Sequence, residues 1–562
     1  MENKSKNFIL QENNYDFHYK KQKSDIDIRF NRVAFIFFVF FVISVIYSIH
    51  LLHLGSRNIG LEKQNQLEVI NKLNRANIVD RNGNYIAKTV SSIDIGINPT
   101  DVINQKKLLL NLGYIFPDKN YEIIKSNLKK KKFFWFEKKI SEENYEKIMM
   151  LGDKSIKPQE KITRIYPQKN LFSHIIGQID DDNFGISGLE KSLDNELRNS
   201  EKDIKLTVDK NIQYLIREEL IKYNEIFQTL GSGAILMNVD NGEIISLVSL
   251  PDFDLNERKN ITDKNFINRV TKGVYEFGSV FKTFTLAAAL NENYLDLNTE
   301  FKNLKKSIKC GKNIITEYDD EIPSNLTAEE ILIRSGNIGS VRIGQLIGLE
   351  KFKEFMNKLD LMKSIEFDIE EVGVPVSFRW GKCKLATASY GHGITTTILQ
   401  LANAYSIIVN GGYKINPTLI KKNEYSKNEK IIEEDVSKKI NSILRKIVTT
   451  KEGTASLANV EGYEVGGKTG TAQKSTAGGY SRNKINTFAS IFPTSNPKYT
   501  LVVMLDEPKI NSEYIYNYRD GSGIKYKGTP FNTAGWTSVE VVGQIIEKIG
   551  PILATKYNEV NN

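Results

Sequence analysis

Cysteine and histidine are scarce in this sequence. The 562 residues include two cysteines, Cys310 and Cys383, and five scattered histidines. Neither set has the spacing of a metal site, and two cysteines are too few for a disulfide-rich scaffold. One disulfide and two free thiols are both compatible with the sequence.

Long hydrophobic runs are equally scarce, since only one segment is long enough to cross a bilayer. Residues 33–54 lack any formal charge over about 22 positions, which as a helix span ~30 Å of hydrocarbon. A cleaved signal peptide would have a shorter apolar core and a small-residue cleavage site, and neither is present. We therefore expect a single crossing by an uncleaved anchor.

The segment before the anchor is basic, which predicts its orientation. Five lysines or arginines lie between positions 20 and 32. Basic flanks stay on the cytoplasmic side of a membrane. We therefore expect residues 1–32 to be cytoplasmic and everything after Leu54 to lie outside the cytoplasm.

The length of the chain exceeds that of one ordinary domain. Its formal net charge of +9 suits a neighbourhood of anionic polymers or lipid headgroups, without choosing between them. The composition changes near Lys205, because residues 55–204 are polar and lysine-rich whereas longer apolar runs follow. A domain boundary is expected there.

The segment after Lys205 has the pattern of a mixed fold. Residues 206–220 have a helical period, and residues 233–250 are two β-rich runs around an Asp-Asn-Gly turn, which predicts a hairpin. Further predicted elements are strands at 485–493 and 499–508 and an amphipathic helix at 538–553. The pattern predicts an α+β fold with an antiparallel sheet and helices packed on it.

Ser279 and Lys282 lie one helical turn apart in the stretch YEFGSVFKTFTLAAAL, residues 275–290. Gly278 allows a tight turn, and the apolar residues that follow predict a buried helix. Burial and the positive helix end would lower the pKa of Lys282, and a neutral lysine beside a serine can activate a nucleophile. On this stretch alone, an N-cap serine with a snorkelling lysine explains the pattern equally well.

Two further motifs favour the catalytic interpretation. The only K-T-G of the chain, at residues 468–470, lies in a glycine-rich segment just before the predicted strands. An S-x-N at residues 335–337 follows a capping box from Thr327 to Glu330, where the helix should break. Each motif is weak alone, because glycine-rich turns are common and S-x-N recurs elsewhere in the chain.

The order of these three motifs carries more weight than any one of them. S-x-x-K, S-x-N and K-T-G in this order form the triplet of penicillin-binding enzymes. The chain resembles a class B penicillin-binding protein, a peptidoglycan D,D-transpeptidase, and most closely the cell-division (septal) type. The Y-G-x-G before T-T-T-I-L-Q-L-A in residues 389–412 favours the septal over the elongation type. Other segments that match boxes of the family are 75–90, 164–180, 185–197, 249–256 and 452–455.

The resemblance implies an architecture. A single transmembrane helix would precede an elongated, mixed pedestal domain and an α+β transpeptidase domain, whose antiparallel sheet is flanked by helices. The implied boundaries are a cytoplasmic tail at 1–32, an anchor at 33–54, a pedestal at 55–204 and a transpeptidase domain at 205–556. The catalytic domain would then be periplasmic, on the cell inner (plasma) membrane.

The resemblance also implies roles for individual residues. Ser279 would be the nucleophile and Lys282 its general base, in a reaction that needs neither metal nor cofactor. Backbone N–H groups of Ser279 and Thr471 would form the oxyanion hole. The remaining implied roles are a proton relay for Ser335, orientation of Lys282 and the donor amide for Asn337, a fixed positive charge for Lys468, and substrate binding for Thr469, Gly470 and Thr471.

The implied partners are peptidoglycan stem peptides, β-lactams as covalent inhibitors, and membrane proteins of the division machinery, including a lipid II polymerase; nucleic acid is not expected. Several alternatives stay open. These are an elongation-type transpeptidase, a D,D-carboxypeptidase, a serine β-lactamase, which would be shorter and lack a pedestal, and a catalytically inactive division scaffold.

Overall fold

The computed structural model describes residues 25–56, 75–180, 182–257, 266–311, 313–422, 429–476 and 479–558. Backbone contacts divide the chain into two units, residues 1–73 and residues 74–562. Residues 1–24 of the expected cytoplasmic tail lie outside the described residues, as do residues 57–74 after α2.

The first unit contains one long helix, α2 (Asp25–Ser56). Its stretch Ala34–His53 has 20 residues with a mean hydropathy of 2.6, and none of that stretch is buried. By length and composition it can cross a membrane, in agreement with the predicted segment at 33–54. The crossing itself stays a prediction.

The second unit begins with a five-stranded mixed sheet, in which the long strand β2 is central. β2 pairs antiparallel with β1, β3 and β4, while β1 also pairs parallel with β5. Its strands are β1 (Ile78–Val79), β2 (Tyr85–Ile97), β3 (Phe134–Ile140), β4 (Ile156–Ile165) and β5 (Ile204–Lys205). The short helices that accompany it are α4 (Gln105–Ile115), α5 (Tyr121–Lys129), α6 (Glu142–Met149), α7 (Ser173–Ile176), α8 (Gly188–Ser192) and α9 (Asp194–Asn199).

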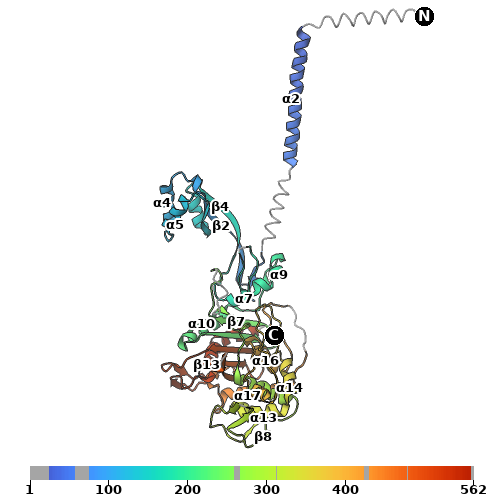
Figure 1. The fold of residues 1–562 in the computed structure, drawn as a ribbon, viewed down its shortest axis with the longest axis vertical. Helices are drawn as coiled ribbons and strands as arrows, with labels where there is room; N and C mark the ends of the chain where they lie inside the picture. Colours follow the sequence, from blue (N-terminus) through green and yellow to red (C-terminus); the bar gives the residue numbers. More distant parts are fainter. Residues whose placement is uncertain are drawn as a thin grey trace, which may run out of the picture. The chain divides into compact units, whose positions relative to one another are not determined.

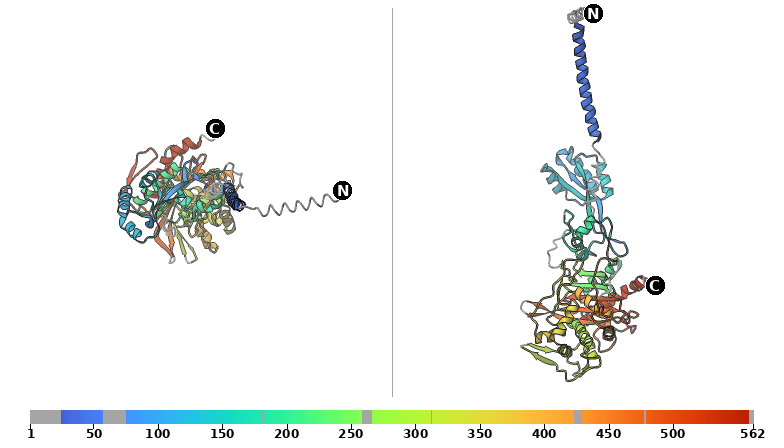
Figure 2. Two further views of the ribbon diagram at one scale, coloured as in Figure 1. Left: turned by 90° about the horizontal axis from the view of Figure 1, so that it is seen from above. Right: turned by 90° about the vertical axis from the view of Figure 1, so that its right-hand side faces the viewer.

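This first part of the unit has two cores. The outer ends of β2 and β4 pack with β3, α4, α5 and α6 in a small core of their own, around Leu112 and Ile148. The inner ends join the main core of the molecule. In Figure 2 the small lobe, in light blue and cyan, lies apart from the orange and red strands.

A buried ion cluster ties together segments of this part that are far apart in sequence. Glu190 of α8 accepts from Arg75 at 2.5 Å and from Arg164 at 2.8 Å, and Arg75 also meets Asp194 at 2.6 Å. Both arginine side chains and the Glu190 side chain are almost fully buried. The cluster therefore joins β4, α8 and α9 to the first residues of the unit.

The second part of the unit has an antiparallel sheet in the order β12-β13-β14-β6-β7. β6 (Gly231–Asn238) and β7 (Ile244–Leu250) form the predicted hairpin, and β13 (Gly479–Phe492) and β14 (Tyr499–Asp506) are the two predicted strands. β12 (Gly466–Thr476) is the edge strand and contains the K-T-G motif. The expected α+β class with an antiparallel sheet is confirmed.

Helices cover both faces of this sheet (Figure 1). On one face lie α10 (Lys210–Ile226) and α18 (Ser538–Asn558), and on the other α16 (Ile398–Val409), followed outward by α17 (Glu434–Thr449) and α11 (Phe281–Asn291). Every residue of α16 is buried, because this helix is enclosed between the sheet and the other helices.

One predicted boundary was wrong by a turn. The helical period was assigned from residue 206, whereas α10 begins at Lys210. Asp209 is the reason, because its carboxylate caps the backbone N–H groups of Asn211 and Ile212 and so starts the helix there.

The remaining elements surround α11 and the open edge of β12. They are β8 (Glu300–Phe301), β9 (Ser307–Cys310), β10 (Asn313–Thr316), β11 (Leu326–Thr327), α12 (Ala328–Ile333), α13 (Asn337–Ile347), α14 (Leu349–Lys358), α15 (Lys382–Ala388), β15 (Ile515–Asn517) and β16 (Lys525–Lys527). Short 3-10 turns are η1 (Pro99–Asp101), η3 (Gly278–Val280), η4 (Ser456–Ala458) and η5 (Ala534–Trp536).

Candidate active site

Ser279 lies in the 3-10 turn η3, directly before α11. Two glycines bring this turn against its neighbours. A Cβ on Gly470 of β12 would lie 2.1 Å from the carbonyl oxygen of Phe277, and one on Gly391 would lie 1.9 Å from that of Gly278. Only glycine permits such close backbone approach, so Gly470 fixes the turn against β12 and Gly391 fixes it against the loop that follows α15.

Polar contacts hold the start of α11 from behind. The Tyr405 hydroxyl of α16 donates to the carbonyl of Val280 and lies 2.9 Å from the Thr283 hydroxyl. The Thr285 hydroxyl donates to the carbonyl of Ser389 at 2.8 Å. Since these groups are buried, the serine turn has a rigid support.

Lys282 lies in the first turn of α11 and is 1% exposed. Its ammonium donates to the carbonyl of Ser335 at 2.5 Å, to Asn337 Oδ1 at 2.7 Å and to Ser335 Oγ at 3.3 Å. Among the described residues, none of these hydrogen bonds of Lys282 goes to Ser279. Catalytic hydrogen bonds commonly tighten only when substrate is bound.

The S-x-N segment connects α12 to α13, as the predicted helix break requires. The capping box from Thr327 to Glu330 is present, and Ser335 adopts a left-handed backbone conformation with φ of 59°. A non-glycine residue in that region is strained, which is common at functional sites. The turn directs both Ser335 and Asn337 towards Lys282.

Lys468 of β12 approaches the same hydroxyl from the other side. Its side chain is fully buried and donates to Ser335 Oγ at 2.9 Å. Thr469 shares a 2.7 Å hydroxyl contact with Thr454, and Thr471 Oγ1 accepts from the backbone N–H of Ala534. The structure thus brings the three predicted motifs together around Ser335.

A cavity of about 570 Å³ opens above these residues. Ser279, Ser335, Asn337, Thr469 and Thr471 all line it. Lys282, Lys468 and Gly470 are not among its lining residues. The two lysines therefore lie beneath the floor of the cavity, buried behind Ser335, which both of them contact.

Burial governs the protonation of both lysines. It lowers the pKa of Lys282 to about 7, and the negative charge of Glu317 offsets part of that shift. It also lowers the pKa of Lys468 well below the usual value, and the neighbouring Lys282 lowers it further. The direction for Lys282 agrees with the prediction from sequence. Burial and the like charge of Lys282 both oppose a positive charge on Lys468, and its role as a fixed positive charge stays a prediction.

A hairpin that carried no sequence signal supports the S-x-N turn. After β9 and β10, the Glu317 carboxylate accepts from the backbone N–H groups of Asn337 at 2.6 Å and Ile338 at 2.8 Å. Asn337 Nδ2 also donates to the carbonyl of Thr316 at 2.9 Å. The hairpin therefore fixes both the backbone and the side chain of Asn337.

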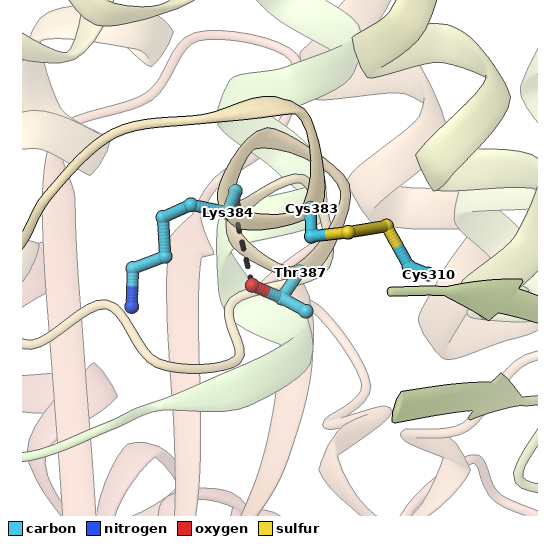
Figure 3. The surroundings of a disulfide bond; sticks show 4 residues. All are labelled: Cys310, Cys383, Lys384 and Thr387. Carbon is cyan, nitrogen blue, oxygen red and sulfur yellow. Dashed lines mark hydrogen bonds between the residues drawn. A yellow bond between two sulfur atoms is a disulfide. The ribbon is translucent and has the colours of Figure 1, made fainter. Parts of the chain in front are cut away.

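The two cysteines are joined in a disulfide that anchors this hairpin (Figure 3). Cys310 ends β9, and Cys383 lies in the first turn of α15. The structure thus decides the question that the sequence left open. Beside this bond, the Thr387 hydroxyl donates to the Lys384 carbonyl at 3.2 Å within α15, the helix that leads to the loop containing Gly391.

Two residues of the site, Glu317 and Thr454, lie outside the three predicted motifs. Thr454 lies in the matched E-G-T-A box and contacts Thr469, so a family box did mark it. Glu317 had no comparable signal. Within the described ranges, no group of three or more histidine, cysteine, aspartate or glutamate side chains is arranged to hold a metal ion.

Comparison with protein families matches the two parts of the second unit separately. Residues 232–523 match the penicillin-binding protein transpeptidase domain, and residues 71–224 match the penicillin-binding protein dimerisation domain. The chain belongs to the class B penicillin-binding proteins. All eight predicted site residues of this penicillin-binding protein lie inside the matched transpeptidase domain.

Individual relatives are similar over most of the chain. The probable peptidoglycan D,D-transpeptidase FtsI of Caulobacter vibrioides is 28% identical over 502 residues, which cover 86% of this chain and 82% of that protein. The stage V sporulation protein D of Bacillus subtilis is 30% identical over 483 residues, which cover 77% of this chain and 74% of that protein. The probable peptidoglycan D,D-transpeptidase PenA of Neisseria gonorrhoeae is 27% identical and covers 84% of each.

Proposed function

We propose that this protein is a membrane-anchored peptidoglycan D,D-transpeptidase that cross-links stem peptides during septal wall synthesis. One observation carries the proposal. A buried lysine with a pKa of about 7 is held by Ser335 and Asn337, one helical turn after a serine that lines a cavity. Membership of the class B family agrees with this chemistry.

In the first half-reaction, the Ser279 hydroxyl attacks the carbonyl of the penultimate D-Ala and forms an acyl-enzyme. Neutral Lys282 accepts the hydroxyl proton. The side chain of Asn337 and the carbonyl of Ser335 hold the Lys282 amine in place. Ser335, which contacts both lysines, relays the proton to the leaving D-Ala.

The negative charge of the tetrahedral intermediate needs donors at the serine turn. The backbone N–H groups of Ser279 and Thr471 form the oxyanion hole in this proposal. The close contact between η3 and β12 supports the pairing, since a Cβ on Gly278 would lie 3.0 Å from the carbonyl oxygen of Thr471. One such donor contributes about 3–4 kcal/mol to stabilising the transition state.

The terminal carboxylate of the donor peptide binds along β12, at Thr469, Gly470 and Thr471. The side chain of Lys468, which precedes Thr469 on the same strand, is buried, and an anion bound nearby raises the pKa that burial has lowered. The bound carboxylate therefore stabilises the positive charge proposed for Lys468. An amine from a neighbouring stem peptide then takes the acyl group and completes the cross-link.

The helix at Ala34–His53 supports membrane anchoring in this proposal, with the basic tail at residues 1–32 inside the cell. A reporter that is active only outside the cytoplasm should be active when fused after residue 562, and the mature protein should keep residue 1. A mature N-terminus near residue 56 would contradict the anchor.

The septal role and its partners follow from the same proposal. The chain would receive fresh glycan strands from a lipid II polymerase of the division machinery, through the anchor and the pedestal. An unrelated anchor in place of residues 33–54 should leave acylation intact and weaken recruitment to the septum. Depletion that gives round cells with normal septa would favour the elongation type instead.

Exposure to benzylpenicillin tests the enzymatic proposal. Intact mass should increase by one stable adduct, located on the peptide that contains Ser279, and the variant Ser279→Ala should remain unmodified. An adduct elsewhere would overturn the assignment of the nucleophile. Rapid turnover of the drug would favour a β-lactamase, and absence of any adduct would favour a scaffold.

A further inference from the structure

The cavity above Ser279 has a one-sided charge. Lys484 is the only lysine or arginine among its lining residues, and no aspartate or glutamate is among them. Lys282 and Lys468, whose pKa values burial lowers, do not line the cavity, so Lys484 is the charged side chain that a ligand meets there. A cavity of this kind favours an anionic ligand.

Lys484 lies on β13, directly opposite Gln473 of β12. Cross-strand partners project from the same face of a sheet, and both residues line the cavity. Gln473 is two residues beyond Thr471 along β12, which corresponds to about 7 Å in an extended strand. Lys484 therefore extends the cavity beyond the position proposed for the terminal carboxylate.

Lys484 differs from Lys474, another lysine of the same sheet, in its lack of an acidic partner within the described part of the chain. Lys474 is paired with both Asp506 and Glu507 at 2.8 Å. Lys484 instead donates to the backbone carbonyl of Asn532 at 2.9 Å, and among the described residues no carboxylate lies within ion-pair distance of it. Burial lowers its pKa without an opposing charge. A half-buried ammonium without an acidic partner is costly unless a ligand supplies one.

We infer that Lys484 and Gln473 form a second anion-binding position, which takes a side-chain carboxylate of the donor peptide in addition to the C-terminal carboxylate. The inference rests on the proposed function and specifies the class of peptide that acts as its acyl donor. Along an extended peptide, the residue two before the C-terminus lies about 7 Å from the C-terminal residue, which matches the step from Thr471 to Gln473. The carboxylate therefore belongs to the residue two before the C-terminus, where diaminopimelate carries one and lysine does not.

Two penicillins test this position, because carbenicillin differs from benzylpenicillin by one carboxylate on its side chain. The quantity of interest is the ratio of their second-order acylation rate constants, carbenicillin over benzylpenicillin. Lys484→Gln should lower this ratio about fivefold, the effect of one partly exposed ion pair. Lys484→Arg should keep the ratio near the wild-type value, and Lys484→Glu should lower it further.

Arg482→Gln is the matched control. Arg482 lies on the same strand, is exposed and does not line the cavity, so its removal changes the net charge equally. In Arg482→Gln, the ratio of the two acylation rate constants should stay at the wild-type value. An equal fall in this variant would overturn the inference in favour of a general charge effect. An unchanged ratio in Lys484→Glu, with both drugs still acylating, would also overturn it.

The same comparison with donor peptides separates the natural substrate from the drugs. A donor with diaminopimelate as its third residue should react faster than one with lysine, and Lys484→Gln should remove that preference. Equal rates for both donors in the wild type would overturn the assignment of donor class. Failure of benzylpenicillin to acylate the wild type would instead refute the proposed function, so the two failures are distinguishable.

Discussion

The protein buries charge in two places that are built in opposite ways. In the first part of the second unit, the Glu190 carboxylate lies between the guanidinium groups of Arg75 and Arg164. In the transpeptidase part, Lys282 and Lys468 meet at the Ser335 hydroxyl, and among the described residues no carboxylate pairs with either. Opposite charges in contact stabilise each other's ionised forms, whereas like charges favour loss of a proton. The first cluster therefore holds structure together, whereas in the second burial lowers the pKa of Lys282, as the proposed role of a base requires.

The largest expected effect comes from a variant in which residue 282 carries a permanent positive charge. Arginine keeps the charge but cannot deprotonate in a protein. Lys282→Arg should abolish acylation nearly as fully as Lys282→Met, with a loss of ~10²–10⁴ in rate. Stopped-flow acylation of both folded variants measures it. A Lys282→Arg variant that acylates at the wild-type rate would show that Lys282 is not the base.

A change in the ion cluster around Glu190 should have the opposite effect, a loss of stability with no loss of acylation. Glu190→Gln leaves two buried arginines short of a carboxylate, and Asp194 compensates Arg75 only in part, so stability should fall by about 3 kcal/mol. Acylation per folded molecule should not change, because the cluster does not touch the cavity. Thermal unfolding and titration with labelled penicillin check both outcomes. A large fall in acylation rate at full occupancy of the folded state would mean that the two clusters are coupled.

Lys468 is buried like Lys282, but its proposed role is that of a positive charge and not of a base. Lys468→Arg should acylate about tenfold faster than Lys468→Met, because a charged donor to the substrate carboxylate survives. The effect should appear in the binding step more than in the chemical step. Equal rates for the two variants would indicate that the volume of the side chain matters and its charge does not.

Substitution of Glu317 should have the smallest effect of the four, a shift of the acylation pH profile to lower pH. Its negative charge raises the pKa of Lys282, so Glu317→Gln should lower that pKa further. The midpoint of the acylation pH profile should then move to lower pH, by less than about one unit. Glu317→Ala also removes both hydrogen bonds at the start of α13 and should slow acylation at all pH values. A midpoint that moves to higher pH would contradict the electrostatic role.

The sequence predicted those features that depend on neighbouring residues. The Asp-Asn-Gly turn specified the β6–β7 hairpin, the capping box specified the start of α12, and the Ser279 stretch specified a buried lysine. In each case the signal and the structure lie within one turn or hairpin. The order of the three motifs then carried the prediction that they meet.

Features that depend on docking between distant segments could not be predicted in this way. Glu317 reaches the backbone of Asn337 across 20 residues, and it is one of 68 acidic residues with nothing to distinguish it. The Cys310–Cys383 disulfide closes a separation of 73 residues. The separate core of the small lobe likewise depends on how β3 and β4 pair with β2, which no local pattern specifies.

The pH dependence of acylation by benzylpenicillin tests the central claim most directly, because it titrates the proposed base in the working enzyme. The second-order rate constant should rise about tenfold per unit at low pH and level off above the pKa of Lys282, at about 7. The rise has this sign because only the neutral amine accepts the serine proton. A rate that is independent of pH, or that continues to rise to the ordinary pKa of lysine, ~10.4, would contradict the account.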